Sequence, residues 1–202
     1  MQESKQRPDH GLASRFGSAL NPLRHLGSLG FLFFWIIAVT GIYLYAVLDT
    51  SATGAYRSID AISREQWYLG GLLRSLHRYS ADAFLIVMTA HLIREWVLGH
   101  FQGFRRFSWL TGVPLLLFGF ACGVGGFWLN WDQLGQFSAQ ATAEWLDSLP
   151  LFASPLTRNF LSTSAVSDRL FSLFVFIHLG LPLLMLFGSW FHIQRISLAK
   201  VF

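Results

Sequence analysis

The amino-acid sequence predicts an all-α fold, a bundle of four helices that cross a lipid membrane. Its 202 residues are 53% hydrophobic and only 13% charged, well below the charged fraction of an average soluble domain. Residues 27–48, 107–131 and 170–194 contain no Asp, Glu, Lys or Arg. Each run is long enough to cross a hydrocarbon core, which needs ~20 apolar residues. Composition and these runs together exclude an ordinary soluble domain.

The fourth span is predicted from about Leu72 to Leu98, where the pattern is helical and apolar but interrupted by ionisable side chains. They are Arg74, His77, Arg78, Asp82, His91, Arg94 and Glu95. A transfer scale penalises such residues at membrane depth. Ionisable residues inside a span are therefore treated as functional, and this helix becomes the most informative of the four.

We divide the chain into an N-terminal segment (1–25), a helical membrane domain (26–197) and a short tail (198–202). A tight connection around His100–Arg106 joins the second and third helices, and a long one from Asp132 to Arg169 joins the third and fourth. Within it, the Gln140–Leu149 stretch is amphipathic and is followed by Pro150 and Pro155, so we expect a short helix lying on the membrane surface.

The distribution of charge predicts the orientation. Nine of the 15 cations and three of the 11 acids fall on the side that holds both termini. Positive residues accumulate on the cytoplasmic face, so both termini are expected inside, in a bacterial-type energy-transducing membrane. The first 25 residues lack the short apolar core of a cleavable signal, and the first span is expected to direct insertion itself. The net charge of +4 follows from topology and requires no nucleic-acid partner.

Four histidines form two pairs of equal spacing inside two of the spans. His77 and His91 are 14 residues apart, as are His178 and His192. Fourteen residues make just under four helical turns, so both members of a pair point the same way about 21 Å apart. Because the second and fourth helices run in the same direction, His77 faces His178 near the outer surface and His91 faces His192 near the inner one.

This arrangement predicts two stacked haems, each held by a histidine from both helices. Neutral imidazole is a good iron ligand. A lone membrane histidine more often makes a hydrogen bond between helices, but four with matched spacing argue against that interpretation. A zinc or di-iron site lacks carboxylates at partner spacing. The single cysteine, Cys122, cannot form a disulfide within the chain and is interpreted as a small core residue.

The same interval recurs on the other two helices, between Gly27 and Gly41 and between Gly112 and Gly126. Glycine is common in membrane helices because it lets backbones approach closely. Alternatively, glycines leave space where a flat haem passes the two helices that do not ligate it. The shared period favours the second interpretation.

Sequence segments along residues 20–197 resemble the cytochrome b family of bc-type quinol oxidoreductases, in particular its short four-helix photosynthetic-type branch. The matching segments are LGSLG (26–30), TG (40–41), LRSLHRYSA (73–81), HLIR (91–94), FSWLTGV (107–113), GVGGFWLNWDQLG (123–135), LPLFASPL (149–156) and HLGLPLL (178–184). Histidines at fixed spacing on two helices make the resemblance specific.

The resemblance implies two non-covalent b-type haems and assigns Arg74 and Arg94 to the outer and inner propionates, which are anions that a guanidinium binds well. Arg78 and Arg195 are possible second cations. It also implies a quinone pocket near the turn at Trp131, Asp132 and Gln133.

The family further implies partners. We expect a subunit that carries the missing C-terminal part of cytochrome b with its Pro-Glu-Trp-Tyr sequence, an iron-sulfur protein and a c-type cytochrome, in a dimeric complex. The chain is then a redox subunit that is not catalytically complete alone.

Three positions depart from the family pattern. Asn130 stands where the family usually has proline, which puts the geometry of the predicted quinone pocket in question. His25 replaces the cysteine that attaches an additional haem in the photosynthetic branch, so no covalent haem is expected. Leu173 stands where the family tends to have an arginine, and the nearest arginine is Arg169.

The alternative function is a di-haem membrane anchor that links the quinone pool to a peripheral dehydrogenase or reductase without bifurcation. A ferric-reductase-like chain also uses two histidine pairs, but the glycine pairs and the four-helix count argue against it. A haem-free transporter or scaffold is the remaining interpretation that involves no redox chemistry.

Overall fold

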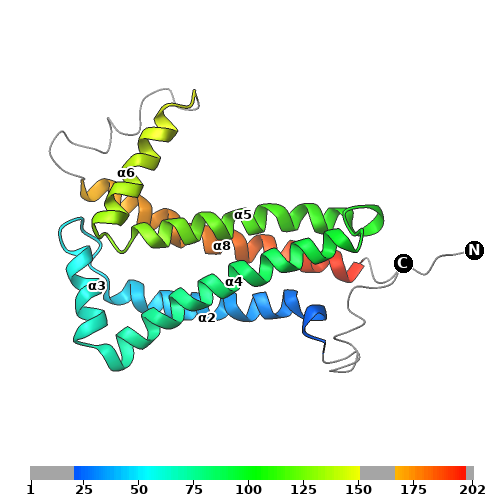
Figure 1. The fold of residues 1–202 in the computed structure, drawn as a ribbon, viewed down its shortest axis with the longest axis horizontal. Helices are drawn as coiled ribbons and strands as arrows, with labels where there is room; N and C mark the ends of the chain where they lie inside the picture. Colours follow the sequence, from blue (N-terminus) through cyan, green and yellow to red (C-terminus); the bar gives the residue numbers. More distant parts are fainter. Residues whose placement is uncertain (1–20, 151–166, 199–202) are drawn as a thin grey trace, which may run out of the picture.

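The computed structural model describes residues 21–150 and 167–198, in which four long helices run side by side (Figure 1). They are α2 (Leu26–Val47), α4 (Leu72–Val97), α5 (Arg106–Trp128) and α8 (Asp168–Leu198). The predicted helical bundle is confirmed.

The four helices form two pairs. α2 packs along α4 and α5 packs along α8, and the two pairs meet mainly through α4 and α5. α4 and α8 run in one direction while α2 and α5 run in the other (Figure 1). The histidine pairs therefore lie on parallel helices, as the sequence predicted. The end at which α4 and α8 begin is called the outer end below, and the opposite end is the inner end.

Three of these helices are long and apolar enough to cross a membrane, and the protein is an integral membrane protein. The apolar segments are Leu26–Val47, Gly103–Trp128 and Asp168–Gln194. α4 has 26 residues but carries charged side chains along its length. It runs beside the other three over the same extent (Figure 1).

The outer end carries a helix that we did not predict. α3 (Ala55–Arg64) crosses the end of the bundle and is followed by a π-helical turn, η2 (Trp67–Gly71), that leads into α4. Ala55 and Ile62 are its buried residues. Apolar residues at 55, 59 and 62 have helical spacing, and this pattern could have predicted α3 from the sequence.

The second helix at the outer end, α6 (Gln133–Asp147), begins seven residues before the predicted start at Gln140. Asp132 provides the physical reason, because its Oδ1 accepts a hydrogen bond from the backbone N–H of Gly135 at 2.7 Å. An aspartate in this position satisfies a free N–H at the start of a helix. The helix ends before Pro150, as predicted.

The connection between α4 and α5 is tight, in agreement with the sequence. Gly99 and Gly103 have φ angles of 79° and 64°, in the left-handed region that favours glycine. A short 3₁₀ turn, η3 (Gly103–Arg105), leads into α5.

The buried core lies at the outer end, where α5, α6 and α8 meet the start of α3. Its members are Ala55, Trp131, Ala139, Leu170, Phe171, Phe174 and Val175. The ring of Trp131 lies 4.7 Å from that of Phe171, centre to centre. Small alanines on α3 and α6 let these helices pack closely against the aromatic rings.

Several predictions fall on residues 1–20, 151–166 and 199–202, which lie outside the described residues. They concern most of the N-terminal segment, the last six residues of LPLFASPL with Pro155, and most of the tail. An N-terminal 3₁₀ turn, η1 (Pro22–Arg24), precedes α2 and is capped by the side chain of Asn21.

Candidate haem-binding centres

The imidazole rings of His77 on α4 and His178 on α8 face each other at the outer level, with ring centres 6.4 Å apart. Two imidazoles that share a metal ion, with metal–nitrogen bonds of about 2.0 Å and ring centres about 1.1 Å behind the nitrogens, have centres about 6.2 Å apart. The observed spacing fits one iron atom between the rings.

At the inner level, the level of His91 and His192, Gly112 on α5 lies close to both histidine-bearing helices. A Cβ atom at this glycine would lie 3.6 Å from Cε1 of His192 and 3.7 Å from Cδ1 of Leu92, the neighbour of His91. His192 on α8 therefore lies beside the part of α4 that carries His91. The structure places the two outer rings side by side, and it places His91 and His192 at one level of the bundle.

Hydrogen bonds fix the ring nitrogen that His77, His178 and His192 present. Nδ1 of His77 lies 3.0 Å from the carbonyl of Ile37, and Nδ1 of His178 lies 3.0 Å from the carbonyl of Cys122. A carbonyl only accepts, so Nδ1 carries the proton and donates in both neutral rings. This leaves the lone pair on Nε2 for a metal, the arrangement that fixes ligand orientation in metal sites.

His192 reaches the same state through a hydroxyl. Thr111 Oγ1 donates to the carbonyl of Ser108 at 2.9 Å and lies 3.0 Å from Nδ1 of His192. Because the hydroxyl has used its hydrogen, it accepts from Nδ1–H. Thr40 is the corresponding residue beside His77, with its Oγ1 3.1 Å from Nδ1. Sequence reasoning missed both threonines.

Cys122 supports His178 in a way that the sequence analysis also missed. Pro182 lies inside α8 and has no N–H, so the carbonyl of His178, four residues earlier, loses its helical donor. The thiol of Cys122 donates to this carbonyl at 3.7 Å. The available signal was the proline four residues after a histidine.

Each of the four 14-spaced glycines faces the histidine at its own level. A Cβ atom at Gly41 would lie 3.0 Å from Cε1 of His77, and one at Gly126 would lie 2.9 Å from Cε1 of His178. The corresponding distance at the inner level is 3.5 Å from Gly27 to Cε1 of His91, against the 3.6 Å already given for Gly112. The missing side chains leave space beside the imidazoles, with less room at the outer level.

Arg74 at the outer level is held by two neutral acceptors. Its Nη1 donates to Ser63 Oγ on α3, and its Nη2 donates to Asn130 Oδ1 after α5, both at 3.1 Å. Asn130 is the residue that departs from the family pattern. Neither partner cancels the charge, so the guanidinium remains available to an anion.

Arg94 at the inner level is held by a carboxylate instead. Its Nη1 donates to Glu95 Oε1 at 2.7 Å, and Nδ1 of His91 lies 4.0 Å from the same oxygen. The other oxygen of Glu95 binds Nδ1 of His100, and Arg105 lies 4.0 Å away. His100 is thus part of a charged network at the inner end.

One further polar group fits an anionic cofactor near the inner level. The indole Nε1–H of Trp109 is buried and has no hydrogen-bond partner among the described residues. Trp109 lies one turn before Gly112 on α5. A buried donor of this kind is costly unless a bound group accepts from it.

The predicted quinone-pocket residues have structural contacts in this chain. Trp131 is 2% exposed and packs on Phe171 and Phe174, with a φ angle of 52°. Its carbonyl accepts from Gln136 Nε2 at 2.8 Å, and Asp132 caps α6. Gln133 is exposed.

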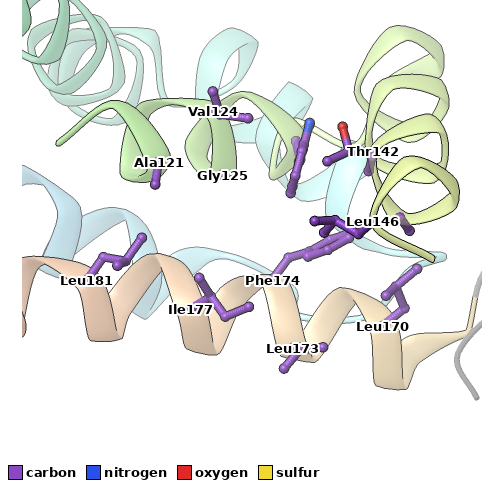
Figure 2. A pocket seen from close by; sticks show the side chains of 13 residues that line it. Ala121, Val124, Gly125, Thr142, Leu146, Leu170, Leu173, Phe174, Ile177 and Leu181 are labelled. Atoms are coloured by element: carbon purple, nitrogen blue, oxygen red, sulfur yellow. The ribbon is translucent and has the colours of Figure 1, made fainter. Parts of the chain in front are cut away.

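An apolar cavity of ≈ 360 Å³ lies beside this turn, between α5, α6 and α8 (Figure 2). Leu146, Phe174, Ile177 and Leu181 line it, and Thr142 contributes a hydroxyl. Leu173, which stands at the third departure from the family pattern, is also part of this wall. Its size and lining are typical of sites for apolar small molecules.

The fold defines a class, namely membrane helix bundles, here with histidines of α4 and α8 at two levels. Groups of three or more His, Cys, Asp or Glu residues that could hold a metal ion are absent from residues 21–150 and 167–198. Residues 13–199 match the family described as cytochrome b/b6/petB, and the chain belongs to the cytochrome b family.

A solved structure described as "Hyperthermophilic respiratory Complex III" is similar to this chain, with a TM-score of 0.74 and 22% sequence identity. The match covers 88% of this chain and 48% of the other. This likeness shows the fold, and the present chain spans about half the length of that neighbour.

Proposed function

We propose that this chain is a di-haem b-type cytochrome subunit that moves electrons across the membrane in a quinol oxidoreductase. His77 and His178 hold the outer haem, and His91 and His192 hold the inner haem. The observation that carries the proposal is the 6.4 Å spacing of the outer rings, which suits one shared iron atom. Membership in the cytochrome b family supports it independently.

The ligand set determines what the haems do. A haem held by two imidazoles would have no free position for oxygen or substrate, so it would only pass electrons. Ile37, Thr111 and Cys122 hold Nδ1 of His77, His192 and His178, which would leave Nε2 of these three rings for an iron. The glycines keep neighbouring side chains away from the rings.

The chain provides donors that would bind the anionic propionates of a haem at each level. Arg74 serves the outer propionates, and Arg94 serves the inner ones together with the indole N–H of Trp109. Support comes from the free charge of Arg74 between two neutral acceptors and from the buried, unpartnered Nε1 of Trp109.

α4 is the fourth span in this proposal, and both termini are cytoplasmic. The apolar cavity between α5, α6 and α8 is the candidate quinone site on the outer side, in place of direct contacts from Trp131 and Asp132. Gln133, which is exposed, stays a candidate contact. Partner subunits complete the pocket, and bifurcated chemistry additionally requires an iron-sulfur protein and a c-type cytochrome.

Pigment analysis of the purified chain tests the proposal. We expect two protohaems per chain and a low-spin spectrum typical of bis-imidazole ligation. His178→Ala is expected to remove the outer haem and spare the inner one, and His192→Ala is expected to do the reverse. Retention of both haems in either variant contradicts the proposal, as does a wild-type chain without haem.

The alternative function, a di-haem anchor for a peripheral redox enzyme, differs in its quinone chemistry. Haem reduction by quinol in the isolated complex, with and without inhibitors of the outer quinone site, separates the two. An anchor is expected to purify with a peripheral dehydrogenase or reductase instead of an iron-sulfur protein and a c-type cytochrome.

A further inference from the structure

α4 has an exposed face opposite its two histidines. Side chains on this face recur at intervals of three or four residues, and all of the following are exposed: Ser75, Tyr79, Asp82, Ile86, Ala90 and Ile93. At ~100° per residue they lie on one side of the helix, with His77 and His91 on the other. The other described helices leave this face uncovered, with Tyr79 68% and Ile86 70% exposed.

Asp82 lies at the centre of this face, between the levels of the two histidine pairs. It follows His77 by five residues and precedes His91 by nine, which places it deep in the span. Within residues 21–150 and 167–198 it makes no hydrogen bond or ion pair. Lipid offers no donor to a carboxylate at this depth, so a bare lipid-facing surface is strongly disfavoured.

A second copy of the chain does not satisfy Asp82. Two copies inserted in the same orientation and related by a two-fold axis along the membrane normal place equivalent residues at equal depth. Pairing through this face would bring one Asp82 against the other, and two carboxylate groups offer each other acceptors without a donor. The partner must differ from this chain at that depth.

We propose that this face of α4 binds a transmembrane helix of a different subunit, which carries a basic or hydrogen-bond-donating side chain at the depth of Asp82. Ser75 and Ala90 lie on either side of Asp82 on the same face, and small residues let two helix backbones approach closely. Polar side chains at such interfaces join helices by hydrogen bonds. The inference rests on the proposed function only in treating α4 as membrane-spanning.

The first test removes the carboxylate from the tagged, full-length chain in its native membrane. Asp82→Leu is expected to lower the recovery of one integral membrane polypeptide at least tenfold, at unchanged haem content per chain. Asp82→Asn keeps the hydrogen bond and is expected to retain more of that polypeptide. Recovery unchanged in Asp82→Leu overturns the proposal.

The second test identifies the neighbour directly and does not depend on that variant. A photo-reactive amino acid is placed at Ile86 on this face or at Ile42 on α2, two positions that are 70% and 71% exposed. The Ile86 probe is expected to join the chain to the polypeptide that Asp82→Leu loses, and the Ile42 probe is not. Adducts at position 86 with lipid only, or with a differently tagged second copy, overturn the proposal. Failure of the proposed function shows itself separately, as missing haem in the wild-type chain.

Discussion

The outer and inner ends of the bundle support equivalent histidine pairs with different physical means. At the outer end, α3, α6 and the start of α8 enclose a buried core around Trp131 and Phe171, and Arg74 is held by neutral partners. At the inner end the support is a charged network in which Glu95 joins Arg94 and His100.

The two ends are therefore expected to respond differently to substitution and to salt. Burial of apolar surface is non-directional and does not depend on single charged partners, so the outer end is expected to be the more rigid. Charge pairs near a membrane surface are screened by ions and depend on each partner. The space beside the imidazoles also differs between the ends, because the glycines leave less room at the outer level than at the inner one.

Substitution of a residue in the outer core is expected to lower the stability of the chain most. Trp131→Ala removes a side chain that is 2% exposed and is expected to lower the free energy of unfolding by about 3–5 kcal/mol. Phe101→Ala near the inner end, where Phe101 contacts Trp109 and is only partly buried, is expected to cost less. Thermal unfolding of the two variants in the same detergent measures the difference. An equal or larger loss in Phe101→Ala would contradict the assignment of the core to the outer end.

Substitution of the glycines is expected to cost less stability, and the cost should differ between the outer and inner levels. Gly126→Ala places a methyl group 2.9 Å from Cε1 of His178 and is expected to cost about 1–3 kcal/mol through overpacking. Gly112→Ala places it 3.6 Å from Cε1 of His192, an ordinary contact, and is expected to be nearly neutral. Redox difference spectra of the two purified variants report which haem is weakened. Equal weakening of the inner haem by Gly112→Ala would show that the space beside the ring is not the deciding factor.

The long helices and the histidine levels could be predicted because both follow from local periodicity. Charge-free runs identify three spans, and His77 with His91 share a helix face at any geometry close to 3.6 residues per turn. Because successive spans alternate in direction, the second and fourth of four spans, α4 and α8, must be parallel. These inferences require no knowledge of which side chains touch.

The remaining features depend on contacts between segments far apart in sequence. Asn130 reaches Arg74 across 56 residues, and Thr111 reaches His192 across 81. No spacing rule brings such pairs together. Trp131 was predicted at a quinone pocket because the resemblance to the cytochrome b family implies a pocket near this turn, whereas its burial depends on Phe171, 40 positions later.

Two substitutions that change one charge each, one at either end of the bundle, are expected to have a smaller effect. Glu95→Gln removes an anion near His91 and is expected to raise the midpoint potential of the inner haem, because a nearby negative charge stabilises the oxidised iron. Asn130→Asp adds an anion against Arg74 and is expected to lower the potential of the outer haem. Each shift corresponds to about 1–2 kcal/mol for one charge at about 9 Å and an effective dielectric constant of about 20, or about 40–90 mV for a one-electron couple.

Potentiometric titration of the haem spectra of both variants measures these shifts, and each variant serves as the control for the other. The charge change at each end lies about 20 Å from the other haem, so the distant potential is expected to move far less. Since the two substitutions change only an amide into a carboxylate or the reverse, packing is nearly conserved. Shifts of the same sign in both variants would contradict this prediction. They would mean that the charges beside Arg94 and Arg74 do not set the potential of the nearer haem.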